Sequence, residues 1–393
     1  MSDGKGNSRR RIVVTGIGVC SPAGNGQRDF WQGLLNGTSH QSPPPWPQSE
    51  SMRCKLVCRV PGNGNGAKPE NGADTGRIAV DACREALSDA GIQTGPNIRI
   101  GMAVGTAMGG FDTGVNYSKI AVPELALVNS PAHFLARTFA VTGPVSAVPA
   151  ACAAGSIAIV YAMLQLQQGR ADAMLAGGFD TISDVPFAGF SSLHLLTGDR
   201  VRPFDRGRSG FLIGEGAGFV VLEALESAAK RGAEVYAEIR GFGLGADSFH
   251  VIHPHPQAEG LIRAMKGAMK MARCRPEEID YVNSHGTATK ANDKSESLAL
   301  NAGLNGKGRK IVTSSFKAVL GHTMGAAGAI ETIGCLLAIK HKCIPPTWNF
   351  QEADPECNVD CVPNVPRPMA VKTVIKNSSG FGGTNCSLLL SAC

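Results

Sequence analysis

Residues 148–161 read VPAACAAGSIAIVY, and this stretch indicates the fold class of the chain. Small residues surround Cys152, and residues 153–168 are apolar on nearly every side, which predicts a central helix buried all round. A comparable arrangement returns later, where a turn rich in Gly and Ala leads into the very apolar segment 325–340. The sequence therefore carries a coarse internal duplication.

Short runs rich in Val and Ile occur on both sides of this stretch, and many of them end at Gly. They predict strands covered on both faces. The predicted strands are residues 11–18, 98–105, 171–178, 218–223, 235–241, 279–284, 310–314 and a final stretch within 371–390. Segments with helical periodicity lie between them, at 76–90, 224–231, 259–272 and 293–301. Alternating strands and helices predict an α/β fold with a mostly parallel sheet.

The duplication and a Gly-rich segment at 241–245 predict two halves, residues 1–243 and 244–393. Asp293 stands three residues before Glu296, as in a variant of the capping box. Residues 41–71 are rich in Pro, Gly and Asn, which predicts an irregular surface segment.

The composition limits the classes of function. No apolar run reaches the ~18 residues of a membrane span, and residues 1–11 are polar and basic, so we expect a cytoplasmic protein without a membrane partner. The 12 cysteines are expected to be reduced, and the pairs Cys54/Cys58 and Cys357/Cys361 lack the surroundings of a zinc site. A net charge of +6 without a basic run fits an acidic protein partner better than nucleic acid.

Cys152 is the candidate nucleophile. A Cys at a helix N-terminus lies at the positive end of the helix dipole, which would lower its pKa and favour the thiolate. The alternative at this point is a buried structural Cys, the commonest state of a free cysteine.

Further polar residues gather in three later motifs. His285 follows a predicted strand and precedes Thr287 and Thr289, and Lys317 and His322 precede Glu331 in the next motif. The GFGGTN run at 380–385 offers backbone N–H groups to an oxyanion, or forms a tight hairpin turn. A thiol, two imidazoles and a donor loop together suit acyl transfer through a thioester.

These motifs resemble those of the β-ketoacyl-acyl-carrier-protein synthases of the elongating kind, over nearly the whole chain. The matching stretches are VTGIGVCSPAGN at 14–25, AACAAGS at 150–156, AGGFD at 176–180, RPFDRGRSGFLIGEGAG at 202–218, HGTAT at 285–289 with its following Asp and Glu, LGH at 320–322 with GAAGAIE at 325–331, and GFGGTN at 380–385. The resemblance implies the thiolase fold, with five αβαβα layers and two duplicated halves, and a homodimer. It implies no cofactor, because the substrates arrive on the phosphopantetheine of an acyl-carrier protein.

The resemblance also implies a role for each site residue. Cys152 accepts the acyl group, and its N–H forms an oxyanion hole with that of Phe381, which also gates the site. His285 and His322 hold the malonyl thioester carbonyl and stabilise the enolate formed on decarboxylation. The remaining implied roles are electrostatic support from Lys317 with Glu331, and substrate binding by Thr287, Thr289 and Gly382.

The set Cys-His-His distinguishes this chain from related condensing enzymes, which use Cys-His-Asn or a second Cys. It predicts a decarboxylative Claisen condensation that lengthens an acyl thioester by two carbons. One alternative is a non-catalytic subunit that shapes the pocket of a heterodimer, against which the retained Cys152 argues. A nucleotide-binding protein is set aside, because no GxGxxG follows the first strand.

Two segments depart from the family pattern. Residues 109–134 are shorter than usual in a region that contributes to the acyl pocket, and residues 67–76 lack the usual basic cluster for an acidic carrier protein. The remaining candidates for carrier docking are Arg200, Arg208 and Lys68, which suggests a specialised carrier or acyl chain.

Overall fold

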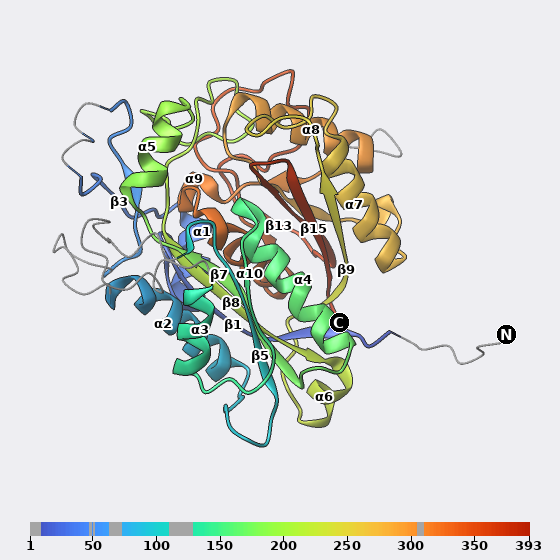
Figure 1. Ribbon diagram of the computed structural model, residues 1–393. Helices are drawn as coiled ribbons and strands as arrows, with labels where there is room; N and C mark the ends of the chain where they lie inside the picture. The colour runs from blue at the N-terminus through green and yellow to red at the C-terminus, as the bar shows by residue number, and fades with distance from the viewer. Residues whose placement is uncertain (1–8, 47–48, 50–51, 63–72, 110–128, 305–309) are drawn as a thin grey trace.

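The computed structural model describes residues 9–46, 49, 52–62, 73–109, 129–304 and 310–393 (Figure 1). Its main sheet has eleven strands in the described residues, in the order β11-β10-β14-β15-β9-β1-β8-β7-β5-β6, with β2 beside β1. The strands are β1 (Ile12–Ser21), β2 (Gly24–Asn25), β5 (Ile100–Gly105), β6 (Val145–Val148), β7 (Ala173–Asp180), β8 (Gly216–Ala224), β9 (Ala237–Ala246), β10 (Tyr281–Asn283), β11 (Thr313–Ser314), β14 (Thr373–Gly380) and β15 (Thr384–Ser391). Two short pairs lie apart, β3 (Gln41–Ser42) with β4 (Val57–Cys58) and β12 (Cys343–Ile344) with β13 (Arg367–Pro368).

The strand order confirms the duplication. The first half runs β1-β8-β7-β5-β6 across the sheet and the second runs β9-β15-β14-β10-β11. Numbered within each half, both read first, fifth, fourth, second, third. The division predicted between residues 243 and 244 falls inside β9, so the place where one half ends stays a prediction.

The prediction of a mostly parallel sheet is wrong. Parallel pairing is confined to the two ends, where β5 pairs with β6 and β7, and β10 with β11 and β14. The strands between them pair antiparallel. The stretch 371–390 is a hairpin of β14 and β15. Helices cover both faces, so antiparallel strands here show the same continuous apolar runs as parallel ones.

Helices form the other layers, and two of these helices lie in the middle of the molecule (Figure 1). The helices are α1 (Gly26–Asn36), α2 (Ala73–Asp89), α3 (Ser130–Thr138), α4 (Ala154–Gln167), α5 (Asp184–Ser192), α6 (Leu225–Lys230), α7 (Glu259–Ala272), α8 (Lys290–Leu304), α9 (Lys317–Leu320) and α10 (Ala327–His341). Helix α4 packs on α10, and both contact strands of the two halves. Helix α2 covers β1 and β8 on one outer face, and α7 covers β9 and β15 on the other. Two residue pairs join β1 to β9, and the halves of the sheet on either side of this junction both pack on α4 and α10. With α2 and α7 outside them, the five predicted layers are present.

Glycines let the two central helices approach closely. A Cβ on Gly155 of α4 would lie 2.8 Å from the Gly325 carbonyl oxygen, and one on Gly328 of α10 would lie 2.5 Å from the Ser156 nitrogen. No side chain larger than hydrogen fits without displacing the backbone. This contact aligns the N-terminal ends of α4 and α10, which carry the one-turn helices η5 (Ala151–Ala153) and η7 (Met324–Ala326).

Among the described residues, no helix combines the length and the apolar character needed to cross a membrane. Part of the segment 41–71 lies outside the described residues, and within the rest β3 and β4 form a short ladder.

Candidate active site

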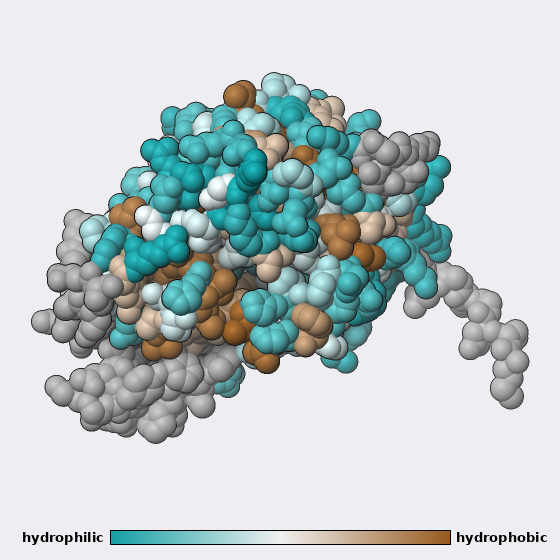
Figure 2. All heavy atoms as spheres, turned by 90° about the horizontal axis from the view of Figure 1, so that it is seen from above, coloured by the Kyte–Doolittle hydropathy of each residue, from teal (hydrophilic) through white to brown (hydrophobic). Residues whose placement is uncertain are grey.

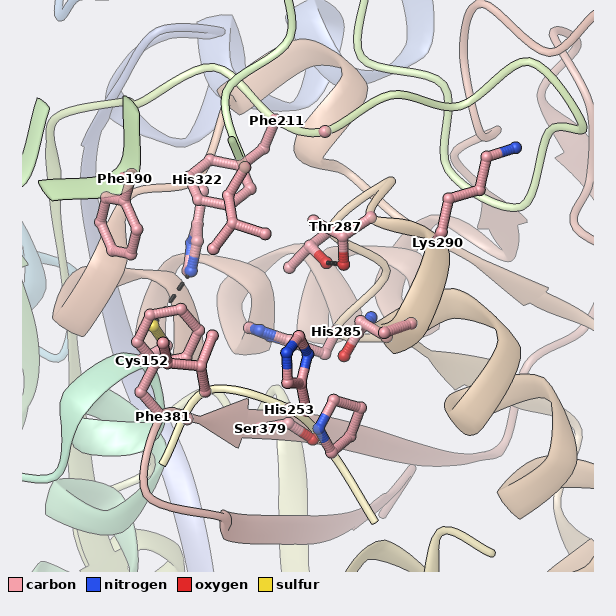
Figure 3. Close-up of a pocket in the computed structure, with 18 of the residues that line it drawn as sticks. Cys152, Phe190, Phe211, His253, His285, Thr287, Lys290, His322, Ser379 and Phe381 are labelled. Carbon is pink, nitrogen blue, oxygen red and sulfur yellow. Dashed lines mark hydrogen bonds between the residues drawn. The ribbon is translucent and has the colours of Figure 1, made fainter. Parts of the chain in front are cut away.

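Cys152 lies in η5, between the end of β6 and the start of α4. Ala151 before it has a φ of 46°, a left-handed conformation that turns the chain sharply. The Cys152 side chain is buried, and its Sγ lies 3.1 Å from Nε2 of His322 (Figure 3). The turn therefore places the thiol against an imidazole from the second half of the chain.

The pKa of Cys152 is raised to about 12, mainly by burial. The Lys317 ammonium and the Phe381 N–H lower it by less. The expectation of a lowered pKa is therefore wrong, because loss of hydration outweighs the favourable charges. At rest Cys152 is a thiol, and its sulfur lies beside Nε2 of a neutral His322.

Two carboxylates of α8 hold the turn that carries His285. The backbone N–H groups of His285 and Gly286 each donate to Glu296 at 2.8 Å. Asp293 accepts from the N–H of Ala288 at 3.1 Å and of Phe204 at 2.8 Å. Helix α8 begins at Lys290, so the capping box predicted for residues 293 and 296 is wrong. Asp293 and Glu296 therefore hold the turn that carries His285 and do not cap the helix.

The two imidazoles pack edge to face beside the cavity. The rings of His285 and His322 have centroids 5.3 Å apart and planes at 81°. Burial, helped by the positive charge of Lys317, lowers the pKa of both well below the ordinary value. Both rings are therefore neutral near pH 7, and each has one N–H to donate and one nitrogen to accept.

Lys317 supports His285 from behind. Its Nζ lies 3.5 Å from His285 Nδ1 and 2.5 Å from Glu331 Oε1, and all three side chains are buried. A further cation that the sequence did not suggest, Lys376 of β14, lies 2.8 Å from the other carboxylate oxygen of Glu331. It stands in a strand of mixed polar and apolar residues, where its sequence neighbours give no sign of an ion pair.

The loop at 380–383 approaches Cys152 from the opposite side. The Phe381 N–H lies close enough to the Cys152 thiol to lower its pKa, which suits an oxyanion donor. Gly382 and Gly383 have φ of 82° and 78°, and their N–H groups bond to Val251 O and Gly380 O. The loop is thus held in a conformation that favours glycine.

A cavity of about 300 Å³ is lined by Cys152, His285, His322 and residues of the loop at 380–383. Thr287 and Thr289 line it with their hydroxyls 2.9 Å apart. Phe190 and Phe211 also line it, and sequence reasoning missed both. Phe211 packs edge-on against His322 at 5.1 Å, and Phe190 against Phe381 at 5.6 Å. The face shown in Figure 2 is largely hydrophilic, with hydrophobic residues gathered near its middle.

The predicted docking residues fare differently. Arg208 is buried and pairs with Asp354, so the prediction that it meets a partner is wrong. Its position in a tight RGRSG turn folds the guanidinium inward, where it also donates to the carbonyls of Asp205 and Lys290. Arg200 is exposed. Lys68, like residues 110–128 of the short segment, lies outside the described residues.

The described residues contain no group of three or more His, Cys, Asp or Glu placed to hold a metal ion. All twelve cysteines are free thiols.

A thiol against one neutral imidazole, with a second imidazole beside it and an N–H close to the sulfur, defines a cysteine-dependent acyltransferase. The family model described as the N-terminal domain of beta-ketoacyl synthase matches residues 9–228, and that of the C-terminal domain matches residues 236–351. The chain belongs to the beta-ketoacyl synthase family, whose members are condensing acyltransferases.

Similar proteins span nearly the whole chain. A 3-oxoacyl-[acyl-carrier-protein] synthase 2 from Coxiella burnetii is 37% identical, with 98% of this chain and 99% of that protein covered. The solved structure of the ishigamide ketosynthase/chain length factor has a TM-score of 0.90 at 37% identity, covering 98% and 100%. A ketosynthase bound to its type II acyl-carrier protein and a hexaketide has a TM-score of 0.87 at 30% identity, covering 98% and 100%. These matches confirm the thiolase fold.

The buried neutral histidines predict acid sensitivity. Below about pH 6.5 the two histidines bind protons in the unfolded chain but stay unprotonated in the folded protein. The free energy of unfolding therefore falls as the pH falls. Between about pH 7.5 and 5.5 we expect the two residues to contribute a loss of about 2 to 3 kcal/mol. Urea unfolding of the wild type and of the His285→Asn, His322→Asn double variant measures it. An equal pH-dependent loss in both proteins would contradict the assignment.

Proposed function

We propose that this enzyme moves an acyl group from a carrier thioester to Cys152 and condenses it with a malonyl thioester, with loss of CO₂. The product is a β-ketoacyl thioester two carbons longer, made in fatty-acid or polyketide biosynthesis. The observation that carries this proposal is the contact of 3.1 Å between Cys152 Sγ and His322 Nε2, with His285 facing the same cavity. One site then offers a nucleophile and two donors for an enolate.

The first half-reaction needs the proton of Cys152 to leave. His322 Nε2 accepts it as sulfur attacks the acyl carbonyl, and the resulting oxyanion is held by the N–H groups of Cys152 and Phe381. When the intermediate collapses, the carrier thiolate departs and takes the proton. Cys152 is then an acyl thioester, and His322 is neutral again.

The second half-reaction uses both imidazoles as donors, with the His322 proton now on Nε2, the tautomer opposite to the one that accepts the thiol proton. The malonyl C–C bond breaks, CO₂ leaves, and the electron pair forms an enolate whose oxygen accepts hydrogen bonds from His285 and His322. Lys317 at 3.5 Å from His285 Nδ1 stabilises this negative charge electrostatically. The enolate carbon then attacks the acyl-Cys152 carbonyl, the thiolate is expelled, and one proton from solvent restores the thiol.

The carrier is proposed to be an acidic acyl-carrier protein, whose phosphopantetheine reaches the cavity past Thr287 and Thr289. No cofactor held by this chain is required. The ketosynthase relative bound to its acyl-carrier protein supports this partner. Twelve unpaired cysteines support a location in the reducing cytoplasm.

A second chain is proposed to complete the assembly as a homodimer. Strand β6 ends the sheet in the described residues, and its side chains at 145–148 are half-buried. An edge strand of this kind can pair with another chain. The ishigamide ketosynthase/chain length factor supports a heterodimer as the alternative, but a subunit that only shapes a pocket has no use for the Cys152–His322 pair. Sedimentation of the purified chain alone distinguishes the two assemblies.

Cys152→Ala is expected to abolish formation of the acyl-enzyme. Decarboxylation of malonyl carrier should persist, because both imidazoles remain. Intact-mass spectrometry with carrier-bound acyl groups of varied length and shape measures the first reaction, and CO₂ release measures the second. A covalent acyl adduct on the variant would refute the nucleophile, and the panel on wild type identifies the acyl class.

Substitutions of the two histidines are expected to affect acylation and decarboxylation differently. His285→Ala should still form acyl-Cys152 but slow decarboxylation by about 10²-fold, the effect of losing one oxyanion donor. His322→Ala should slow both reactions, because only His322 contacts the thiol. The same two assays test this, and equal losses in both reactions for His285→Ala would contradict the division of roles.

Arg200 and Lys68 remain candidates for carrier docking, and Arg200 is the one that lies in the described residues. Arg200→Glu is expected to raise the apparent KM for the acidic carrier several-fold and to weaken its salt dependence, because charges at a rim act mainly on association. Acylation from acyl-CoA should be unchanged. Arg170→Glu is the matched control, since it is also exposed but follows the far end of α4. Equal effects of the two reversals would place docking elsewhere.

A further inference from the structure

Lys376 is a buried cation that the reaction steps above do not use. Its side chain has no solvent exposure, and neither has that of Lys317. The two ammonium groups lie on the two oxygens of one carboxylate, with Lys317 at Oε1 and Lys376 at Oε2 of Glu331. When all three are ionised, this triad carries one net positive charge.

A net charge in a dry interior is costly unless something compensates it. Lys376 donates to the Asn377 carbonyl and, at 3.0 Å, to the Ser378 hydroxyl. These dipoles satisfy its hydrogens but do not cancel its charge. A single lysine would neutralise Glu331, so the second one needs an explanation beyond the ion pair.

The triad connects both sides of the active site. Ser378 Oγ lies 2.9 Å from Ser156 Oγ, and Ser156 stands four residues after Cys152 at the start of α4. At the other end, Lys317 lies 3.5 Å from His285. A continuous chain of buried polar contacts therefore runs from the nucleophile's helix through Lys376 and Glu331 to an imidazole.

We infer that Lys376 is a positioning residue, which holds Glu331 from its second side and leaves a net positive charge behind His285 where the enolate oxygen forms. The inference deepens the proposed function and rests on it. Lys376 does not touch the substrate and acts through Glu331, Lys317 and His285. The charge is worth most when malonyl decarboxylation places an anion in the cavity, since the low dielectric there screens it little.

The charged and titratable groups around His285 agree with this role. Lys317, Lys376 and His322 act on His285 through their charge, and Glu331 and Glu296 pair with its neighbours. Cys152, Asp247, His253 and Lys290 line the same cavity as His285. The two lysines lower the pKa of His285 and of His322, after burial, and so favour the neutral donors. Glu296 is engaged with the two backbone N–H groups of the turn, on the other side of the residue.

The test replaces Lys376 and compares decarboxylation with acylation. Lys376→Met keeps most of the volume without the charge, and Lys376→Gln keeps a donor for Ser378. Both are expected to form acyl-Cys152 at near the wild-type rate. Their kcat for malonyl decarboxylation should fall about tenfold with KM little changed. The acid limb of the pH profile should move to higher pH, because His285 protonates more easily. Lys376→Arg should restore part of both.

Ser378→Ala is the matched control, since it interrupts the same chain without changing charge, and its acid limb should stay in place. Nuclear magnetic resonance of ¹³C-labelled histidine, assigned with His285→Ala, reads the titration of His285 directly. An unmoved titration and acid limb in folded Lys376→Met and Lys376→Gln would overturn the inference. So would a shift reproduced by Ser378→Ala, equal losses in acylation and decarboxylation, or a failure of both uncharged variants to fold while Lys376→Arg folds. If wild type releases no CO₂, the proposed function fails, and the His285 titration still tests Lys376.

Discussion

The close crossing of α4 and α10 is the constraint on which the rest of the molecule depends. Gly155 and Gly328 bring the two backbones within a distance that no side chain allows. Both helices start at the same end of this contact, so η5 and η7 meet there. Cys152 enters the site with the first helix, while His322 precedes the second and Glu331 lies within it. The duplication of the fold thus creates one asymmetric site, because each half contributes different side chains at equivalent places.

That geometry explains why the site can hold so much charge away from water. The central layer is packed on both faces by sheet, and its buried groups are matched by partners from several elements: Asp180 accepts from the N–H groups of Ala107, Met108 and Gly325 and from the Thr106 hydroxyl. Burial still raises its pKa to about 6. Burial dominates the other groups in the same way, keeping Cys152 a thiol and both histidines neutral. The enzyme therefore starts from an uncharged nucleophile and uncharged donors, with the cluster of Lys317, Glu331 and Lys376 one layer behind.

Much of this could be predicted from the sequence, for identifiable reasons. The α7 boundaries at 259–272 and the paired apolar helices were readable because periodicity and small residues have direct local causes. The direction of the strands could not be predicted, because helices cover both faces of the sheet and antiparallel strands then show the same continuous apolar runs as parallel ones. The start of α8 was predicted three residues too late, because Asp293 and Glu296 bind the turn before the helix and do not cap it. Residues 371–390 were predicted as one apolar stretch, whereas a tight glycine turn divides them into β14 and β15. The strand β6 was missed because VSAV is only four residues long and stands between two prolines, Pro144 and Pro149.

The site residues divide along the same line. Cys152, His285, His322, Lys317 and Glu331 stand in motifs with unusual local composition, and the structure brings them together. Lys376, Phe190 and Phe211 stand in ordinary surroundings and reach the site only through the sheet order. Arg208 shows the converse, since a charge in a motif was taken as a surface charge and is an internal tie to Asp354. A sequence motif thus identifies the residues that hold a turn. The electrostatic field at the reacting atoms also depends on side chains that are far apart in the sequence and meet only in the fold. In this enzyme that field includes a lysine that strand β14 places against a helix 45 residues away in sequence, which only the folded chain reveals.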